Sequence, residues 1–378
     1  MVDRRRIVGQ WKQSAAKALV TLVRAEGSSY RRPGARLLIG ADGKYSGTIS
    51  GGCLEAEVVR KAAWLVRGGA VVERYSTLFD DTAEIPFGLG CGGVVDLLFE
   101  PADTPECRAL LAAMEASLGG AESLVATWLP VDEKSLQRAI VRAGGELVFA
   151  SDGLDAEEIA SVVVTDRRVA GRLASERVYV EKLLAPQRLF VLGAGDDARP
   201  VVTLAALLGW SVTVADGRPQ LARAERFPEA ERALTVRCAE ALGIGNADAV
   251  VLMTHSYEQD RALLTGLLAP GAGAGYIGLL GARHRSSLLV SEAAAMLGQS
   301  VDECCERVYA PVGLDLGGDG PEAIALAAIA EVQAWVQGKI GASRRLTADD
   351  VAQHVARGGA SRYVQARCVV GAAALPGQ

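Results

Sequence analysis

Two cysteines of this 378-residue chain lie in unusually glycine-rich surroundings. Cys53 follows Gly51 and Gly52 in the stretch SGGCLEAE, and Cys91 lies in the stretch FGLGCGG. A thiolate is a nucleophile and a soft metal ligand, and glycine lets the backbone turn sharply or approach a ligand closely. Either motif alone is compatible with an ordinary turn that carries a small buried cysteine. Both in one half of the chain favour a site that needs thiols and exposed backbone N–H groups.

Cys53 is predicted to stand at the N-terminal end of a helix. Apolar residues recur at helical spacing after it, at Leu54, Val58, Ala62 and Leu65, and two glycines at 68–69 end the pattern. Free N–H groups and the helix dipole lower the pKa of a thiol at this position. A structural zinc ion would need three or four cysteine or histidine ligands, and this half of the chain contains no histidine.

Short strands separated by glycine and proline turns are expected around these motifs. The strand pattern covers residues 18–24, 35–39, 45–49 and 94–99. The last of these follows the glycines after Cys91 directly. The first half of the chain is therefore predicted to be an α/β domain with short strands.

The second half contains a strand, turn and helix of the dinucleotide-binding type. A strand is predicted at Arg188 to Leu192, a helix ends near Leu208, and a second strand ends at Asp216. The turn between them, GAGDDA at 193–198, matches G-x-G-x-x-[GA]. The alternation of strands and helices continues after it. Further strands are predicted at 234–238, 249–253 and 274–279, and a last strand within RVYAPVGLDLG leads into a helix at 321–335. This pattern predicts a Rossmann domain, a doubly wound parallel sheet.

The candidate nucleotide-binding residues lie in this turn and at the strand ends: Gly193, Ala194, Gly195, Ala198, Asp216, Arg218, His255 and Arg283. Asp216 is placed to accept hydrogen bonds from a ribose diol. His284 and Arg285 follow Arg283, and the three could hold an anion. Asp196 and Asp197 would repel a pyrophosphate unless they point away, and the alternative is that they cap the helix.

Composition excludes several classes of function. The net charge of −5 gives no basic field for nucleic acid, and the basic run at Arg4, Arg5 and Arg6 is expected to be a solvated end. No apolar segment is long enough to span a membrane, and no signal-peptide pattern begins the chain, so a cytoplasmic location is expected. The seven cysteines form no C-x-x-C pair and are expected to remain thiols.

Six blocks, in order, resemble the xanthine dehydrogenase accessory factor family, of the XdhC/CoxI type. They are EGSSYRRPGARLLIGADGKYSGTISGGCLEAEV, FGLGCGGVVDLLFEP, FVLGAGDDARPVVTLAALLGWSVTVADGRP, VLMTHSYEQD, YIGLLGARHR and APVGLDLGGDGPEAIALAAIAEV. The resemblance spans roughly residues 20–332. It implies an N-terminal cofactor-handling domain at 1–185 and a Rossmann domain at 186–336, followed by an extension at 337–378.

The resemblance also implies a function, as an accessory factor that is more a chaperone than a catalyst. Family members are understood to bind molybdenum cofactor (molybdopterin), assist its sulfuration and insert it into a molybdenum hydroxylase of the xanthine dehydrogenase or carbon monoxide dehydrogenase type. The candidate cofactor residues carried over by motif are Gly51, Gly52, Cys53, Glu55, Gly90, Cys91, Gly92 and Gly93. Direct contact of Cys53 and Cys91 with molybdenum is a hypothesis. A cysteine desulfurase is a further expected partner, and a homodimer the expected assembly.

Two questions stay open at this level. The Rossmann domain could bind the nucleotide half of a dinucleotide form of the cofactor, bind NAD(P), or serve as scaffold, because a fold does not fix a function. If it binds NAD(P) catalytically, the protein would be an NAD(P)-dependent oxidoreductase with chemistry near His255 and His284. The extension carries a candidate helix at 347–357, which is either a partner-binding segment or a packed or frayed end.

Overall fold

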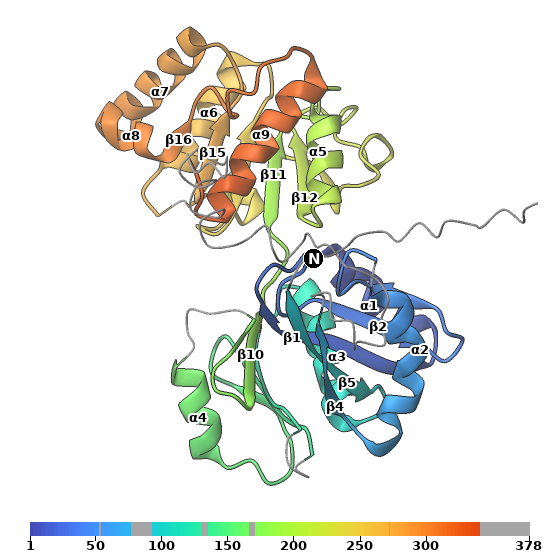
Figure 1. Cartoon of the computed structure of the whole chain (residues 1–378). Coiled ribbons are helices and arrows are strands. Elements are labelled where there is room, and N and C mark those ends of the chain that lie inside the picture. The colour runs from blue at the N-terminus through green and yellow to red at the C-terminus, as the bar shows by residue number, and fades with distance from the viewer. Residues whose placement is uncertain (53, 77–92, 131–134, 166–170, 272, 341–378) are drawn as a thin grey trace, which may run out of the picture. The chain divides into compact units, whose positions relative to one another are not determined.

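A computed structural model describes residues 1–52, 54–76, 93–130, 135–165, 171–271 and 273–340. The chain divides into two compact units between Ala185 and Pro186 (Figure 1). Among the described residues, no helix is both long and apolar enough to cross a bilayer.

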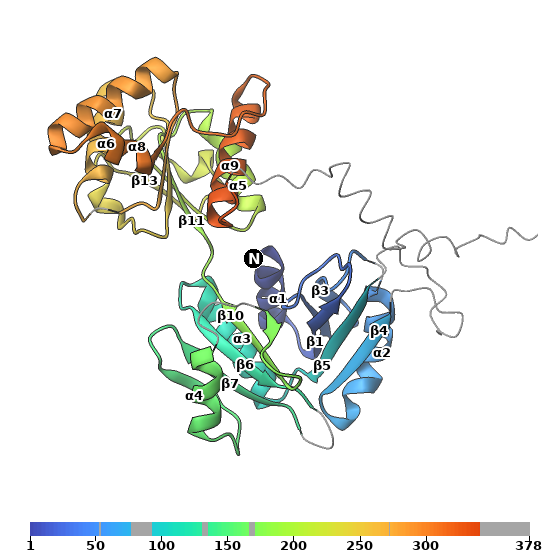
Figure 2. The ribbon, with the colours of Figure 1, turned by 60° about the vertical axis from the view of Figure 1, so that its left-hand side comes forward.

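The first unit begins with a five-stranded antiparallel sheet. Its strands are β1 (Ala16–Glu26), β2 (Arg36–Gly40), β3 (Tyr45–Gly47), β4 (Val71–Ser76) and β5 (Val94–Pro101), in the order β3-β2-β1-β5-β4. Helix α2 (Glu55–Leu65) lies along this sheet (Figure 2) and buries Val58 and Ala62 against it, and a short 3-10 turn, η1 (Val66–Gly68), follows the helix. The predicted strands and the helix after Cys53 are confirmed within a few residues.

A second antiparallel sheet completes the first unit. Its strands are β6 (Ser123–Trp128), β7 (Gln137–Arg142), β8 (Leu147–Ala150), β9 (Arg172–Leu173) and β10 (Val178–Leu183), in the order β8-β7-β6-β10-β9. Helices α1 (Val2–Gln13) and α3 (Pro105–Leu118) contribute Ile7 and Leu111 to one apolar cluster that also takes Leu19 from the first sheet and Val125 from the second. Helix α4 (Ala156–Thr165) contacts β6 (Figure 2).

Two buried ion pairs join the sheets of this unit. Arg36 of β2 pairs with Glu181 of β10, and Arg138 of β7 pairs with Glu100 of β5 at 2.8 Å. Each of these side chains is at most 6% exposed. Moving the sheets apart would separate each pair and leave its charges buried without a partner, which is strongly unfavourable. The two pairs therefore fix the position of one sheet against the other.

The basic run near the N-terminus is part of helix α1, and the expectation of a solvated end is wrong for Arg4. Its guanidinium donates to Ser117 Oγ at 2.9 Å and to the Leu184 carbonyl at 2.7 Å. Asp3 next to it pairs with Arg31 at 2.6 Å. Arg4 and Asp3 therefore tie the first helix to the unit, whereas Arg5 and Arg6 are exposed.

The second unit is a Rossmann domain, as predicted. Its parallel sheet has the order β13-β12-β11-β14-β15-β16. The strands are β11 (Arg188–Leu192), β12 (Ser211–Asp216), β13 (Arg232–Thr235), β14 (Ala249–Leu252), β15 (Tyr276–Leu279) and β16 (Val308–Tyr309). The order reverses between β11 and β14, and ligands of such sheets bind at that reversal, outside the carboxyl ends of the strands.

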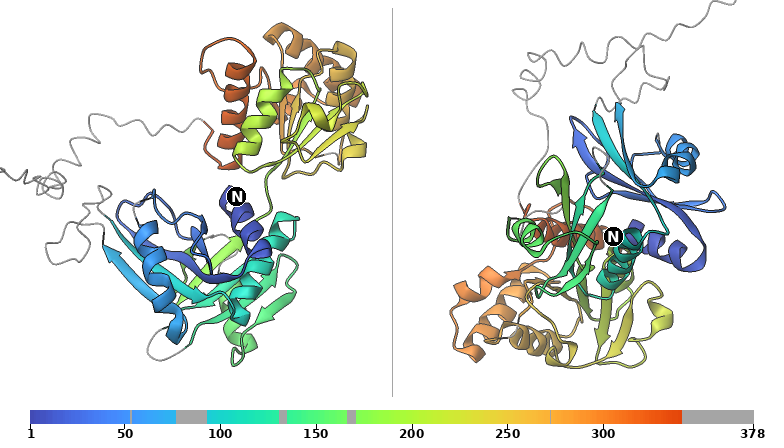
Figure 3. Two further views of the ribbon diagram at one scale, coloured as in Figure 1. Left: turned by 90° about the vertical axis from the view of Figure 1, so that its right-hand side faces the viewer. Right: turned by 90° about the horizontal axis from the view of Figure 1, so that it is seen from below.

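Helices cover both faces of this sheet. Alternate residues of β11 explain why: Leu189 and Val191 enter a cluster with α5 (Ala198–Leu207) and α9 (Pro321–Val336), whereas Phe190 and Leu192 enter a cluster with α6 (Tyr257–Leu268) and α7 (Arg283–Leu297). Helices α5 and α9 lie side by side in Figures 1 and 3. The short helix α8 (Val301–Arg307) contains Cys304 and Cys305.

One strand is displaced from its prediction at both ends. Strand β13 spans Arg232–Thr235, whereas the sequence pattern predicts a strand at 234–238. Residues 236–238 instead leave the sheet, and the short 3-10 turns η2 (Ala224–Arg226) and η3 (Glu240–Leu242) flank this strand. The shift matters because it brings Val236, Arg237 and Cys238 to the edge of a cavity.

Candidate functional site

The loop before helix α2 is organised by one carboxylate, that of Glu55. It accepts hydrogen bonds from Thr48 Oγ1 at 2.5 Å, from the Ile49 N–H at 3.1 Å and from the Ser50 N–H at 2.9 Å. The Ser50 hydroxyl donates to its other oxygen. Burial opposes ionisation of this 3%-exposed side chain, but the hydrogen bonds from Ser50 and Thr48 lower its pKa to about 2. Glu55 is therefore charged at neutral pH and faces its own loop.

Ser50 extends this network toward the cysteine motif. Its hydroxyl oxygen accepts from the Gly52 N–H at 3.3 Å and from the Leu54 N–H at 3.1 Å. Gly52 has a φ of +108°, a conformation that residues with a Cβ rarely adopt. The residues on both sides of Cys53 are thus held by Ser50 and, through it, by Glu55. Cys53 itself lies outside the described residues.

The flanks of both cysteine motifs meet the same short segment, residues 26–30, at the end of β1. A Cβ built on Gly51 would lie 3.5 Å from Cγ and Cδ1 of Tyr30, which is 73% exposed. A Cβ on Gly93 would lie 2.2 Å from the carbonyl oxygen of Ser28 and 2.8 Å from that of Glu26, so no side chain fits there. Gly90, Cys91 and Gly92 lie outside the described residues.

The other described cysteines differ from this setting. Cys107 and Cys304 are buried, and burial raises the pKa of each thiol, for Cys107 together with the nearby Glu100 carboxylate. Cys238 and Cys305 are exposed. Across the described part of the chain, no three histidine, cysteine or acidic side chains gather as a metal site would require.

In the second unit, the glycine turn after β11 approaches the end of β14 closely. Gly193 has a φ of +124°, and a Cβ there would lie 2.3 Å from the Met253 carbonyl oxygen. Ala198 is fully buried at the start of α5, which accounts for the small residue at the end of the motif. The first and last positions of the motif are thus explained by packing.

Asp216, at the end of β12, is saturated by its own chain. One oxygen accepts from the Ala194 N–H and from Arg218 Nη2, both at 2.8 Å. The other accepts from the N–H of Arg218 at 2.8 Å and from its Nε at 2.9 Å. Burial alone would raise the pKa of Asp216, but the Arg218 guanidinium and the backbone donors keep it below its ordinary value.

The two acidic residues of the turn do not cap helix α5, contrary to the capping expectation. Asp197 stands at the N-cap in a helical conformation (φ −69°, ψ −18°) and makes no capping hydrogen bond. Its carboxylate lies 2.8 Å from Nε2 of His255, and a Cβ on Gly195 would be 2.4 Å from its other oxygen. Asp196 pairs with Arg226 at 2.8 Å. The space beside Gly195 that the motif leaves for a pyrophosphate is occupied by Asp197.

His255 has an uncommon backbone. Its φ of +62° is the only positive value among the described non-glycine residues, and left-handed backbone is rare outside glycine. The neighbouring Thr254 donates to the buried Asp260 at 2.7 Å, and Asp260 pairs with Arg285 at 2.7 Å. These bonds hold the end of β14 in place.

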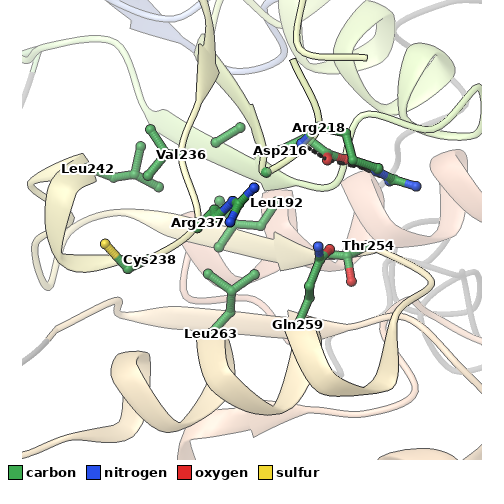
Figure 4. Close-up of a pocket in the computed structure, with 12 residues that line it drawn as sticks. Leu192, Asp216, Arg218, Val236, Arg237, Cys238, Leu242, Thr254, Gln259 and Leu263 are labelled. Carbon is green, nitrogen blue, oxygen red and sulfur yellow. Dashed lines mark hydrogen bonds and ion pairs between the residues drawn. The ribbon is translucent and has the colours of Figure 1, made fainter. Parts of the chain in front are cut away.

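Two cavities flank the glycine turn at the carboxyl edge of the sheet. One, of about 500 Å³, is lined by Asp197, Met253, His255, Leu280, Gly281, Arg285, Pro311, Val312 and Ile324. The other, of about 210 Å³, lies at the ends of β12 and β13 (Figure 4) and is lined by Leu192, Ala215, Asp216, Gly217, Arg218, Val236, Arg237, Cys238, Leu242, Thr254, Gln259 and Leu263. Arg283 and His284 are exposed in the first turn of α7, whereas Arg285 lines the larger cavity.

Sequence reasoning missed three of these residues. Tyr30 and Ser50 lie inside the first family block, but only their contacts with Gly51, Gly52 and Glu55 give them a role. Arg237 was hidden by the strand predicted through Cys238. The signal that could have found it is the pair of polar residues, Thr235 and Arg237, that breaks the apolar run of that strand.

Comparisons with known proteins agree in both units. The family model described as the XdhC Rossmann domain matches residues 189–332, and that of the XdhC and CoxI family matches residues 10–76. A Bacillus subtilis protein named as a probable subunit of xanthine dehydrogenase is 28% identical over 320 residues, 83% of this chain and 91% of its own length. The Escherichia coli molybdenum cofactor insertion chaperone PaoD is 26% identical over 318 residues, 83% of this chain and 81% of its own.

A solved structure shares the fold. The crystal structure of a Bacillus halodurans protein titled a xanthine dehydrogenase superposes with a TM-score of 0.76 at 24% identity. The match covers 93% of this chain and 99% of the other.

Proposed function

The chain belongs to the XdhC and CoxI family, and on that premise we propose that it is an accessory factor that carries molybdenum cofactor to a molybdenum hydroxylase. In this proposal it binds the cofactor, assists its sulfuration and inserts it into an enzyme of the xanthine dehydrogenase type. The similarity over most of their lengths to a protein named a molybdenum cofactor insertion chaperone supports the role. The similarity to a protein named as part of a xanthine dehydrogenase supports the client class.

One observation supports placing the cofactor in the first unit. Gly51 lies against Tyr30, and Gly93 lies against Ser28, so the flanks of both cysteine motifs abut one segment of five residues. In the sequence, Cys53 is the residue after Gly52, and Cys91 comes two residues before Gly93. We therefore assign both thiols to one cofactor site.

The chemical groups of this site are suited to binding molybdenum cofactor. Thiolates are soft ligands for a metal–sulfur centre and nucleophiles for a transferable sulfur, which a cysteine desulfurase would supply. Backbone N–H groups framed by glycine bind phosphate, such as that of the pterin side chain. The exposed ring of Tyr30 offers a flat surface on which a pterin ring could stack. In this proposal Glu55 positions the loop and does not contact the cofactor, because its side chain is buried and accepts hydrogen bonds from Thr48, Ile49 and Ser50.

The test is cofactor retention. The protein is purified from cells that make molybdenum cofactor, and bound pterin is measured by the fluorescence of its oxidised form and molybdenum by elemental analysis. We expect pterin in the wild type and at least tenfold less in Cys53→Ser and Cys91→Ser. Cys305→Ser, which removes an exposed thiol of the other unit, is the matched control and should retain pterin. Equal retention in all four proteins would contradict the cofactor site.

Delivery is tested separately. Loaded protein is mixed with a cofactor-free molybdenum hydroxylase, and the enzyme's activity is followed with time. We expect activation by loaded wild type that exceeds activation by the same amount of free cofactor. A protein that holds pterin but never activates a client would be a storage protein, which would contradict insertion.

An NAD(P)-dependent oxidoreductase is the second candidate, and the 500 Å³ cavity beside His255 is the observation in its favour. Asp197 argues against it, because its carboxylate occupies the space above Gly195 where a pyrophosphate would lie. Oxidation of NADH or NADPH with a panel of carbonyl substrates distinguishes the two. Turnover that survives Cys53→Ser would favour the oxidoreductase.

A further inference from the structure

The 210 Å³ cavity beside Asp216 is not arranged for an unmodified ribose. In dinucleotide sites an acidic side chain at this position accepts hydrogen bonds from the ribose hydroxyls. A carboxylate has about four lone-pair positions, and Asp216 already accepts four hydrogen bonds, one from Ala194 and three from Arg218. It has no acceptor left for a diol while Arg218 stays in place.

The lining of the same cavity contains two arginine side chains, Arg218 and Arg237. Arg218 donates hydrogen bonds to Asp216 from Nε and Nη2, and these bonds hold the guanidinium in place. Its Nη1 remains available to donate to a ligand. Arg237 is exposed and makes no ion pair within the described residues. In Figure 4 it lies in the middle of the group, between Asp216 and the α6 residues Leu263 and Gln259. The charged residues of the lining are Asp216, Arg218 and Arg237, which together leave one positive charge.

The backbone between the two arginines also leaves room. A Cβ on Gly217 would lie 3.1 Å from Cγ and 3.7 Å from Nε of Arg237, so the glycine lets this side chain fold over the strand end. Apolar side chains form much of the remaining lining: Leu192, Val236, Leu242 and Leu263. Apolar side chains can pack against a nucleobase, and the two arginines can bind a phosphate on its ribose.

We propose that this cavity binds a nucleoside that carries a phosphate on its ribose, of the 2′-phosphate class found in NADP(H). An arginine near the end of the second strand accommodates such a phosphate in dinucleotide-binding domains, whereas a free acid selects the diol. The phosphate would contact Arg237 and the free nitrogen of Arg218. The inference is independent of the cofactor role of the first unit, because it rests only on residues of the Rossmann unit.

The direct test uses fragments that lack a pyrophosphate. Binding of adenosine 2′-monophosphate, adenosine 5′-monophosphate and adenosine to the full-length protein is measured by calorimetry. We expect the 2′-phosphate to bind at least tenfold more tightly than adenosine and more tightly than the 5′-phosphate, because a charge-assisted contact to one arginine contributes about a factor of ten. Equal affinities, or no binding of any of the three at millimolar concentration, would overturn the proposal.

Cys238 gives a second, site-specific measurement. Its exposed thiol lines the cavity, so a bound ligand should slow its alkylation by iodoacetamide. Cys305 is also exposed but is not part of the lining, and its alkylation rate should not change. Mass spectrometry of both peptides with and without adenosine 2′-monophosphate measures the two rates. Protection of both thiols, or of neither at saturating ligand, would place the ligand elsewhere.

Arg237→Ala is the decisive variant, since an exposed side chain without an ion pair can be removed without unfolding the domain. It should weaken the 2′-phosphate at least tenfold and leave adenosine unchanged. Arg232→Ala is the matched control, because Arg232 is an exposed arginine of β13 outside the lining. Arg218→Ala should shift preference toward adenosine, because it frees Asp216 for the ribose hydroxyls. Unchanged 2′-phosphate binding in Arg237→Ala would refute the assignment.

Discussion

Replacing Glu55 by glutamine should destabilise the first unit by about as much as protonating it would. The pKa of Glu55 is lowered from 4.5 to about 2 in the folded protein. A difference of 2.5 pKa units corresponds to about 3.4 kcal/mol of stabilisation at neutral pH. A glutamine amide resembles the protonated acid, because one of its two acceptors is replaced by a donor. We therefore expect Glu55→Gln to lower the free energy of unfolding by about 3 kcal/mol at pH 7.

The sign of the pH dependence follows from the lowered pKa. The stabilisation is fully present above the unfolded-state pKa near 4.5 and is lost as the pH falls through about 2. The difference between wild type and Glu55→Gln should therefore shrink to about 2 kcal/mol at pH 3.5. Urea unfolding at pH 3.5, 5 and 7 measures it. Two transitions are expected, one for each unit, and only that of the first unit should move.

Glu57→Gln is the matched control for this experiment. Glu57 lies on the same helix, but it pairs at the surface with Arg60 and Lys61, at 2.8 and 2.9 Å. Exposed pairs contribute about 0–1 kcal/mol, so this variant should have a small effect. If Glu55→Gln cost no more than Glu57→Gln, or if its cost were the same at pH 3.5 and pH 7, the reasoning about the loop network would be refuted.

Three further predictions address the remaining contacts. Tyr30→Ala should reduce retained pterin severalfold while Tyr45→Ala, an exposed tyrosine on β3, should not; equal retention in the two would remove Tyr30 from the cofactor site. Gly93→Ala should lower the unfolding free energy by about 1–3 kcal/mol or more, because the new Cβ would lie 2.2 Å from the Ser28 carbonyl, whereas Gly144→Ala, with nothing within 4 Å, should change it by less than about 0.5 kcal/mol. Asp197→Ala should tighten NADPH binding about tenfold and leave adenosine 2′-monophosphate unchanged, because only the dinucleotide carries a pyrophosphate; calorimetry that showed no gain for NADPH would contradict this account of the space above Gly195.

The Rossmann unit could be predicted closely from sequence because its strands are buried on both faces. In the strand at Arg188 to Leu192 every residue after the exposed Arg188 is apolar and buried, and a glycine turn follows it directly. The prediction of strand bounds was wrong for a strand that is not buried on both faces. Strand β13 is partly exposed, and its apolar pattern extended past the true end at Thr235.

The second sheet of the first unit could not be predicted from sequence. Its strands are two to six residues long, and the pairing of β6 with β10 that joins its two halves connects distant parts of the chain. Strand β10 pairs with β6, about fifty residues earlier, and the buried pairs of Arg36 with Glu181 and of Arg138 with Glu100 join both sheets. Nothing local in the sequence marks a charged residue as buried, because its burial depends on where the partner lies.

The glycine turn of the second unit shows that a sequence motif can be present without the space that binding of a pyrophosphate requires. The pattern G-x-G-x-x-[GA] requires only that the backbone turn and that the helix pack closely, and Gly193 and Ala198 satisfy both. Whether a pyrophosphate can bind depends on the residues that the pattern leaves free. Here one of them, Asp197, turns its carboxylate back over Gly195 and toward His255. A dinucleotide must therefore displace a carboxylate at the turn, whereas a fragment held by Arg237 beside Asp216 need not. The affinity of this domain for nucleotides should accordingly be set at the strand ends rather than by the glycines.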